Sequence, residues 1–145
     1  MTLMMISTRG RYALRVMIDL AEHPSADYIP MKDVAARQEI SLKYLEKIMP
    51  FLTKAGLVEG QHGKGGGYRL CRAPEDYRVG EILRLTEGEL APVACLEHGA
   101  KPCPRVGSCR TIGMWRGFND LTNKYFDGIT LADLMSEKVA DNYVI

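Results

Sequence analysis

The sequence lacks any apolar run near the ~20 residues that a membrane-spanning helix needs. Residues 1–6 also lack the basic stretch and the long apolar core of a secretory signal. Cysteine is scarce, with four residues and no pair spaced as Cys-x-x-Cys. We therefore expect a cytoplasmic protein that does not contact a membrane. In such a protein, clustered cysteines more often bind metal or carry out redox chemistry than form structural disulfides.

Charge is unevenly distributed along the 145 residues. Residues 1–72 contain 11 Lys and Arg against 7 Asp and Glu, a balance of +4, whereas residues 73–145 contain 8 against 11, a balance of −3. A basic half joined to an acidic half is the pattern of a protein whose first part meets a polyanion. The length allows one compact domain with an appendage, and there are no internal repeats.

Apolar residues at helical spacing predict three helices in the first third of the chain, over residues 11–23, 31–38 and 42–49. Ser7 and Thr8 are suitable N-cap residues for the first helix, and Ser41 for the third. A tight turn at residues 39–40 joins the second helix to the third. Pro50 lacks an amide hydrogen and costs roughly 3 kcal/mol inside a helix, so we expect a kink or a break near it.

The second half of the chain predicts one short and one long helix. The short helix covers residues 79–87, and the long helix covers residues 111–126 with an apolar stripe at Met114, Phe118, Leu121 and Tyr125. Thr130 and Asp133 are spaced as a capping box for a final turn. Between the two helices, residues 88–108 show little periodicity and are rich in Pro, Gly and Cys.

The segment "QHGKGGGYRL", residues 61–70, contains four glycines in five positions. A phosphate-binding loop needs a strand before it and a helix N-terminus after it, but here the strand-like run Tyr68-Arg69-Leu70 follows, and then Pro74. The spacing also fails the Gly-x-x-x-x-Gly-Lys-Ser/Thr pattern. Extended runs at residues 57–61 and 68–70 instead predict a β-hairpin with a glycine tip.

Three helices with a tight turn, followed by a hairpin, predict a winged helix-turn-helix: a mainly α fold with a small β-hairpin wing. In this fold the second helix of the motif enters the DNA major groove. On a helical wheel the third helix has an apolar face at Leu42, Leu45, Met49 and Leu52. The opposite face carries Lys43, Lys47 and Lys54, with Tyr44 and Glu46 on its flanks. A solvated lysine face is the alternative, but His62 and Lys64 on a tip slim enough for a minor groove favour DNA binding.

Four segments carry a family pattern: "ISTRGRYALRVMIDLA", "ISLKYLEKI", "LTKAGLVEGQHGKGGGYRL" and "GITLADL". In this order and spacing they resemble the IscR/CymR/NsrR family of bacterial transcription regulators. The resemblance implies a homodimer built on the long helix and binding to a palindromic double-stranded DNA operator. We expect no enzymatic activity, because no Cys–His or Cys-x-x-Cys pair is visible and the chain is small for an additional substrate pocket. We expect a DNA-binding domain at residues 1–87, a cysteine loop at 88–110, and the dimerisation helix with a tail at 111–145.

The resemblance also implies where DNA would be contacted. The residues expected to meet phosphate are Arg9 and Arg11. Those expected to read or line the major groove are Ser41, Lys43, Tyr44 and Glu46, with Lys47 on the same outer face of the helix. The wing tip consists of His62, Lys64, Gly65 and Gly66 with their neighbours.

Cys95, Cys103 and Cys109 are spaced as Cys-x7-Cys-x5-Cys in the aperiodic stretch. A loop of this length is disordered unless something organises it. Three thiolates could do so by binding an iron–sulfur cluster or zinc, whereas incidental cysteines on a mobile loop are the plain alternative. Family members with three cysteines at this place bind an iron–sulfur cluster. The resemblance therefore favours a cluster, with [2Fe-2S] preferred over [4Fe-4S].

The fourth ligand is not evident from the sequence. IscR-type relatives have a histidine where this chain has Ile112, and NsrR-like relatives use an acidic residue near the position of Arg11; neither residue here can bind iron. His98 is the local substitute, and Glu97 is a weaker one. We interpret Cys71, just after the second extended run, as a packing residue rather than a ligand.

The chain ends in Tyr143-Val144-Ile145. An ordinary frayed terminus is one interpretation. The ending also resembles the C-termini of serine acetyltransferases and CymR-type regulators, which dock into O-acetylserine sulfhydrylase.

From the family resemblance and the three cysteines, we expect an iron–sulfur-modulated repressor of iron–sulfur assembly or cysteine and sulfur metabolism genes. The alternatives are a CymR-type regulator acting through that enzyme with a zinc-bound or empty loop, and an enzyme with catalytic cysteines.

Overall fold

The helices of the computed structural model, which describes residues 6–24, 27–101 and 103–135, begin where the sequence supplies caps. Helix α1 (Thr8–Glu22) follows Ser7, whose hydroxyl accepts a hydrogen bond from the Gly10 amide. Helix α3 (Leu42–Lys54) follows Ser41, whose hydroxyl accepts from the Tyr44 amide. Between them, α2 (Met31–Gln38) ends at Glu39, whose φ of 55° makes the predicted tight turn.

The predicted hairpin is present as strands β1 (Val58–Gln61) and β2 (Gly67–Leu70), paired antiparallel in the register Val58 to Leu70. Ile29, just before α2, pairs with Tyr68 on the other edge of β2 through two backbone hydrogen bonds of 2.8 and 2.9 Å. Gly67 has a φ of 151°, and a Cβ there would collide with the Ile29 carbonyl. Glycine is therefore required where the wing joins the helical body.

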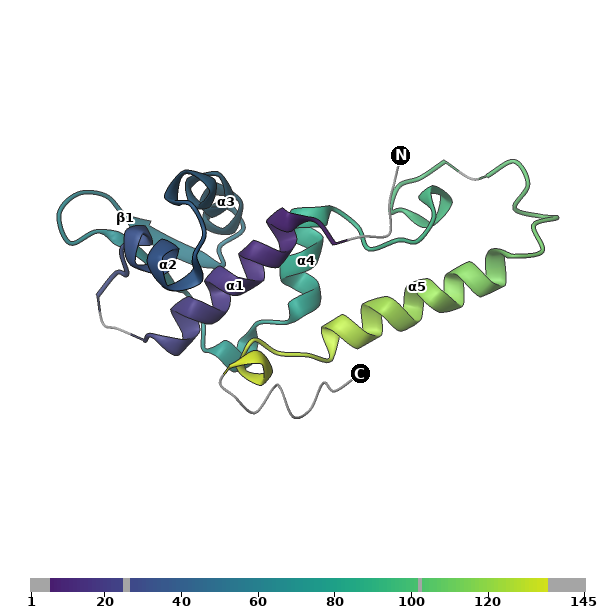
Figure 1. Ribbon diagram of the computed structural model, residues 1–145. Helices are drawn as coiled ribbons and strands as arrows, with labels where there is room; N and C mark the ends of the chain where they lie inside the picture. Colours follow the sequence, from purple (N-terminus) through teal and green to yellow (C-terminus); the bar gives the residue numbers. More distant parts are fainter. Residues whose placement is uncertain (1–5, 25–26, 102, 136–145) are drawn as a thin grey trace.

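The core lies between α1, α2, α3, the wing base and α4 (Val79–Glu87) (Figure 1). Its largest fully buried side chains include Met17, Leu45, Ile48, Leu52 and Ile82. The Asp19 carboxylate is buried beside them and accepts hydrogen bonds from the Arg37 guanidinium and the Gln38 side-chain amide. This ion pair ties α1 to the end of α2 and so fixes the helix-turn-helix.

Tyr77, which is completely buried, closes the base of the wing. Its hydroxyl accepts hydrogen bonds from the amides of Cys71 (2.9 Å) and Arg72 (3.0 Å), and donates to the Leu57 carbonyl (2.6 Å). Its own carbonyl accepts from the Leu131 amide (3.0 Å). The side chain of Tyr77 therefore joins the end of β2 to the start of β1, and its backbone contacts the segment that follows the long helix.

Tyr77→Phe should destabilise the protein by about 1–3 kcal/mol, because it removes the hydroxyl that joins the amides of Cys71 and Arg72 to the buried Leu57 carbonyl. Urea unfolding followed by circular dichroism would measure the change. Tyr68→Phe removes the same atom from a half-buried ring of the wing and serves as the matched control. Equal stability of the Tyr77→Phe variant and the unmodified protein would contradict this account of the hydroxyl.

The long helix α5 (Ile112–Asp127) lies within one residue of its predicted bounds, and Figure 1 shows it extending away from α1–α4. Near its C-terminal end it is attached to α4, where Arg84 bonds to Asn123 and Asp127. The capping box is confirmed: the Thr130 amide donates to the Asp133 carboxylate, and the Asp133 amide donates to the Thr130 hydroxyl. No helix in the described ranges is long and apolar enough to cross a bilayer.

The structure differs from two expectations for α3. Of the kink or break expected near Pro50, the break does not occur, and the helix continues to Lys54. Pro50 is exposed while Met49 and Leu52 are fully buried, so core packing on either side offsets the missing hydrogen bond. Leu42, assigned to the buried face, is 41% exposed. It is the first residue of the helix and lies before the turn that packs on the core.

Candidate nucleic-acid interface and cysteine pocket

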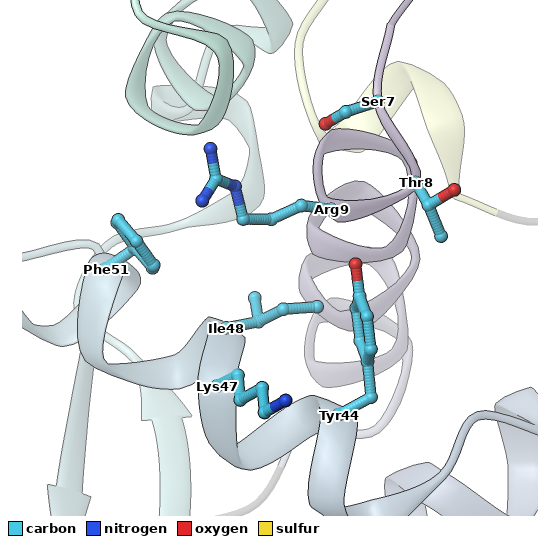
Figure 2. Close-up of a pocket in the computed structure, with 7 residues that line it drawn as sticks. All are labelled: Ser7, Thr8, Arg9, Tyr44, Lys47, Ile48 and Phe51. Carbon is cyan, nitrogen blue, oxygen red and sulfur yellow. The ribbon is translucent and has the colours of Figure 1, made fainter.

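A shallow pocket of about 390 Å³ lies between the start of α1 and the outer face of α3 (Figure 2). It is lined by Ser7, Thr8, Arg9, Tyr44, Lys47, Ile48 and Phe51. Three residues that the sequence predicts to bind DNA, from two separate helices, therefore meet at one place: Arg9, Tyr44 and Lys47. We call this pocket the α1–α3 groove.

The side chains of the α1–α3 groove are held in place by contacts with their neighbours. The Arg9 guanidinium donates to the Thr86 carbonyl at 2.7 Å and lies 4.8 Å from the centre of the Phe51 ring, toward which it points in Figure 2. The Tyr44 ring packs edge-on against Tyr12 at 5.3 Å. The amide and hydroxyl of Ser7 both donate to the Glu87 carboxylate at 2.7 Å. The groove is thus attached to the last turn of α4.

Phe51 is a groove residue that sequence reasoning missed. It is 39% exposed and follows Lys47 by four residues, which places it on the same stripe of α3. An aromatic residue on a lysine stripe was the signal that could have identified it.

The remaining residues predicted to contact DNA lie on α3, on α1 and at the wing tip, and nearly all of them are exposed. Ser41, Lys43 and Glu46 are exposed at the N-terminal part of α3, and Arg11 is exposed on α1, where it donates to the Thr8 hydroxyl. On the wing tip, His62, Lys64 and Gly65 are exposed and Gly66 is half-buried. Gly63 and Gly65 have φ values of 90° and 78°, and the Gly66 amide donates to the Gly63 carbonyl. The glycines therefore make a tight tip.

Cys95, Cys103 and Cys109 line one pocket of about 200 Å³ beside the N-terminal end of α5. Apolar side chains from the loop and the helix line the same pocket, with one cation from α5: Leu96, Val106, Ile112 and Arg116. The hydroxyl and the amide of Thr111 lower the pKa of the Cys109 thiol, as does the Ile112 amide. This favours the thiolate, the form that binds metals.

The other candidates of the cysteine loop lie elsewhere. His98 lines a separate pocket with Arg84, Glu89 and Asn123, and its amide donates to the Glu89 carboxylate. Cys71, interpreted as a packing residue, is exposed instead. Among the described residues, no three His, Cys, Asp or Glu side chains are grouped so as to hold a single metal ion. The structure thus brings the three cysteines to one pocket without arranging them around one ion.

The predicted apolar stripe of α5 lies on its surface. Met114, Phe118, Leu121 and Tyr125 are all exposed, Leu121 by 67%. Exposed apolar patches of this kind mark protein–protein or membrane interaction sites or ligand-binding grooves.

A family profile described as "Rrf2: Iron-dependent Transcriptional regulator" matches residues 6–137. The chain belongs to the Rrf2 family. Protein rrf2 of Nitratidesulfovibrio vulgaris is 40% identical over 134 residues, which are 92% of this chain and 89% of that protein. The HTH-type transcriptional regulator IscR of Aliivibrio salmonicida is 37% identical over 132 residues, 91% of this chain and 77% of that protein. Rrf2 proteins are transcriptional regulators, so the resemblance found in the sequence is confirmed.

Solved structures of the Rrf2 family confirm the fold. CymR (YrzC), the global cysteine regulator of B. subtilis, aligns with a TM-score of 0.72 at 34% identity, over 92% of this chain and 96% of that one. T. potens IscR aligns with a TM-score of 0.69 at 34% identity, over 96% of this chain and 88% of that one. This Rrf2-family chain is therefore a winged helix-turn-helix protein with a long additional helix.

Proposed function

We propose that this Rrf2-family regulator is a dimeric repressor whose operator affinity is modulated by an iron–sulfur cluster. Its targets are genes of iron–sulfur assembly or of cysteine and sulfur metabolism. The observation that carries the proposal is the meeting of Cys95, Cys103 and Cys109 in one pocket at the start of α5. In this proposal residues 1–87 bind DNA, residues 88–110 hold the cluster, and residues 111–145 hold the dimer together.

The cysteine pocket suits an iron–sulfur cluster better than zinc. Clusters are held by cysteine thiolates, and the ligands of a polynuclear cluster lie farther apart than the four ligands of one ion. Three cysteines share a pocket of about 200 Å³, and the matching family profile describes an iron-dependent regulator, which favours iron over zinc. Of the two common cluster types, we propose the smaller [2Fe-2S] cluster. Arg116 lines the same pocket and brings a positive charge to it.

His98 is our candidate for the fourth ligand, with Glu97 as the alternative. The pocket that contains His98 shares Leu96 with the cysteine pocket, so the two pockets are neighbours. Ile112, which does line the cysteine pocket, has no donor atom.

DNA binding in this proposal uses the outer face of α3 in the major groove and the wing tip in the adjacent minor groove. Ser41, Lys43, Tyr44, Glu46 and Lys47 provide the α3 contacts, and His62, Lys64, Gly65 and Gly66 the wing contacts. Arg9 and Arg11 at the start of α1 contact phosphate. Dimerisation through α5 presents two such units, and a palindromic operator with half-sites about 34 Å apart matches that symmetry.

The role of the groove can be tested with Lys47→Ala. Removing one phosphate contact should lower the slope of log binding constant against log salt by about 0.9 per protomer. The slope is measured by fluorescence anisotropy on an operator duplex at several salt concentrations. Lys124→Ala on α5 is the matched control and should leave the slope unchanged. An unchanged slope for Lys47→Ala would remove this face of α3 from the DNA interface.

The cluster is tested by purifying the protein anaerobically and measuring its visible spectrum, iron, sulfide and zinc. We expect a coloured protein containing iron and sulfide, with operator affinity that changes when the cluster is removed. Stoichiometric zinc without iron, or equal operator affinity with and without the cluster, would refute the proposal.

A second candidate is a CymR-type regulator that acts through O-acetylserine sulfhydrylase. The similarity to CymR and the ending Tyr143-Val144-Ile145 favour it, although those three residues lie outside the described part of the chain.

Deleting Ile145 tests this candidate. Loss of one buried apolar anchor removes about 1.5–3 kcal/mol, so binding to the enzyme should weaken by roughly 10- to 150-fold. Calorimetry with and without competing O-acetylserine would measure the affinity. No association of the intact chain with the enzyme at micromolar concentration would exclude the candidate.

A further inference from the structure

Leu42 is a large apolar residue that belongs neither to the buried core nor to the apolar row of α5. It is the first residue of α3, directly after the capping Ser41, and 41% of its surface is exposed. The next apolar residues of the helix, Leu45 and Ile48, are completely buried. A large apolar side chain therefore lies at the N-terminal end of α3, the helix that enters the major groove in a winged helix-turn-helix.

The neighbours of Leu42 are polar groups suited to base edges. Glu46 lies one turn further along the same side of the helix and is exposed, and Lys43 is exposed next to it. The Ser41 hydroxyl accepts from the Tyr44 amide and so acts as the helix cap. Leu42 is the apolar member of this otherwise polar end of α3.

We propose that Leu42 is a specificity-determining residue that contacts the C5-methyl group of a thymine in each operator half-site. This rests on the proposed DNA binding through α3. An aliphatic side chain cannot form hydrogen bonds with base edges. In the major groove, thymine is the base that presents an apolar group, its C5-methyl. Leu42 therefore selects thymine, while Glu46 one turn along selects cytosine through its N4 amino group.

The test begins with selection of binding sites from random DNA duplexes by the full-length chain, purified anaerobically and assayed with and without its cluster. In the selected site, each thymine is then replaced singly by uracil, which lacks only the methyl group. We expect one replacement per half-site to weaken binding about fourfold, the effect of one buried methyl group. Leu42→Ala should bind the thymine and uracil duplexes equally.

Two variants serve as controls. Leu42→Met keeps an apolar side chain of similar size and should still prefer thymine at that position. Lys64→Ala on the wing should weaken binding without changing the ratio of thymine to uracil affinity. Melting temperatures of all variants should match that of the unmodified chain, since Leu42 is outside the core.

Two results would overturn the assignment of Leu42: uracil tolerated at every position, or a thymine preference that persists in Leu42→Ala. A different result, in which no duplex is enriched over random DNA by either form of the protein, would refute the proposed DNA binding itself.

Discussion

Replacing Leu121 with glutamate should convert the proposed dimer into monomers and reduce operator affinity by about 100-fold or more, because two linked DNA-binding units become independent. Leu121 is 67% exposed at the centre of the apolar row on α5. A charge buried in an apolar interface without a partner is strongly unfavourable. Sedimentation velocity measures the oligomeric state, and anisotropy titration measures the affinity for the full operator.

Lys124→Glu places the same side chain elsewhere on the exposed surface of α5 and is the matched control. It should leave the dimer intact. A Leu121→Glu variant that sediments like the unmodified protein would show that the apolar row has another occupant.

Cys103→Ala should abolish cluster retention, since it removes one of the three thiolates that we propose hold the cluster. Iron content should fall from the full value to near zero after anaerobic reconstitution, and the visible absorption should disappear. Cys95→Ala and Cys109→Ala should behave in the same way, because all three side chains line one pocket.

The matched control is Cys71→Ala, which removes an exposed thiol at the base of the wing and should retain full iron. Full iron in Cys103→Ala would remove that residue from the ligand set. His98→Ala tests the fourth ligand separately: an unchanged spectrum would leave Glu97, a group from the partner subunit or a small thiol.

Local signals made much of the fold predictable. Ser7 and Ser41 cap helices by accepting hydrogen bonds from the third residue on, as their sequence positions indicate. The glycine tip forms a hairpin because extended runs on both sides of it pair as antiparallel strands. Pro50 shows the limit: its local penalty was correctly stated, but the burial of Met49 and Leu52 outweighs it, and burial depends on the whole fold.

The sequence grouped the cysteines of the candidate site but did not give the position of its other residues. Spacing alone grouped the three cysteines, and the structure places them in one pocket. His98 was chosen because it is near Cys95 in sequence, yet the loop places it in the neighbouring pocket. Phe51 could not be identified from the sequence, because an aromatic residue in a helix is usually a core residue and only the structure shows which side of α3 is exposed. Contacts between distant segments, such as Arg9 with Thr86, have no local sequence signal.

The attachment of Ser7 and Arg9 to Glu87 and Thr86 has a thermodynamic consequence. Gly88, where the cysteine loop departs, is the next residue after that turn of α4, so the loop and the end of α1 that we propose binds phosphate share one support. If cluster occupancy shifts this support, cluster and operator become linked ligands of a single equilibrium. Reciprocity then requires operator DNA to change the affinity for the cluster by the factor with which the cluster changes the affinity for DNA. Removing iron with a chelator, in the presence and in the absence of operator DNA, would measure the factor by which DNA changes the affinity for the cluster.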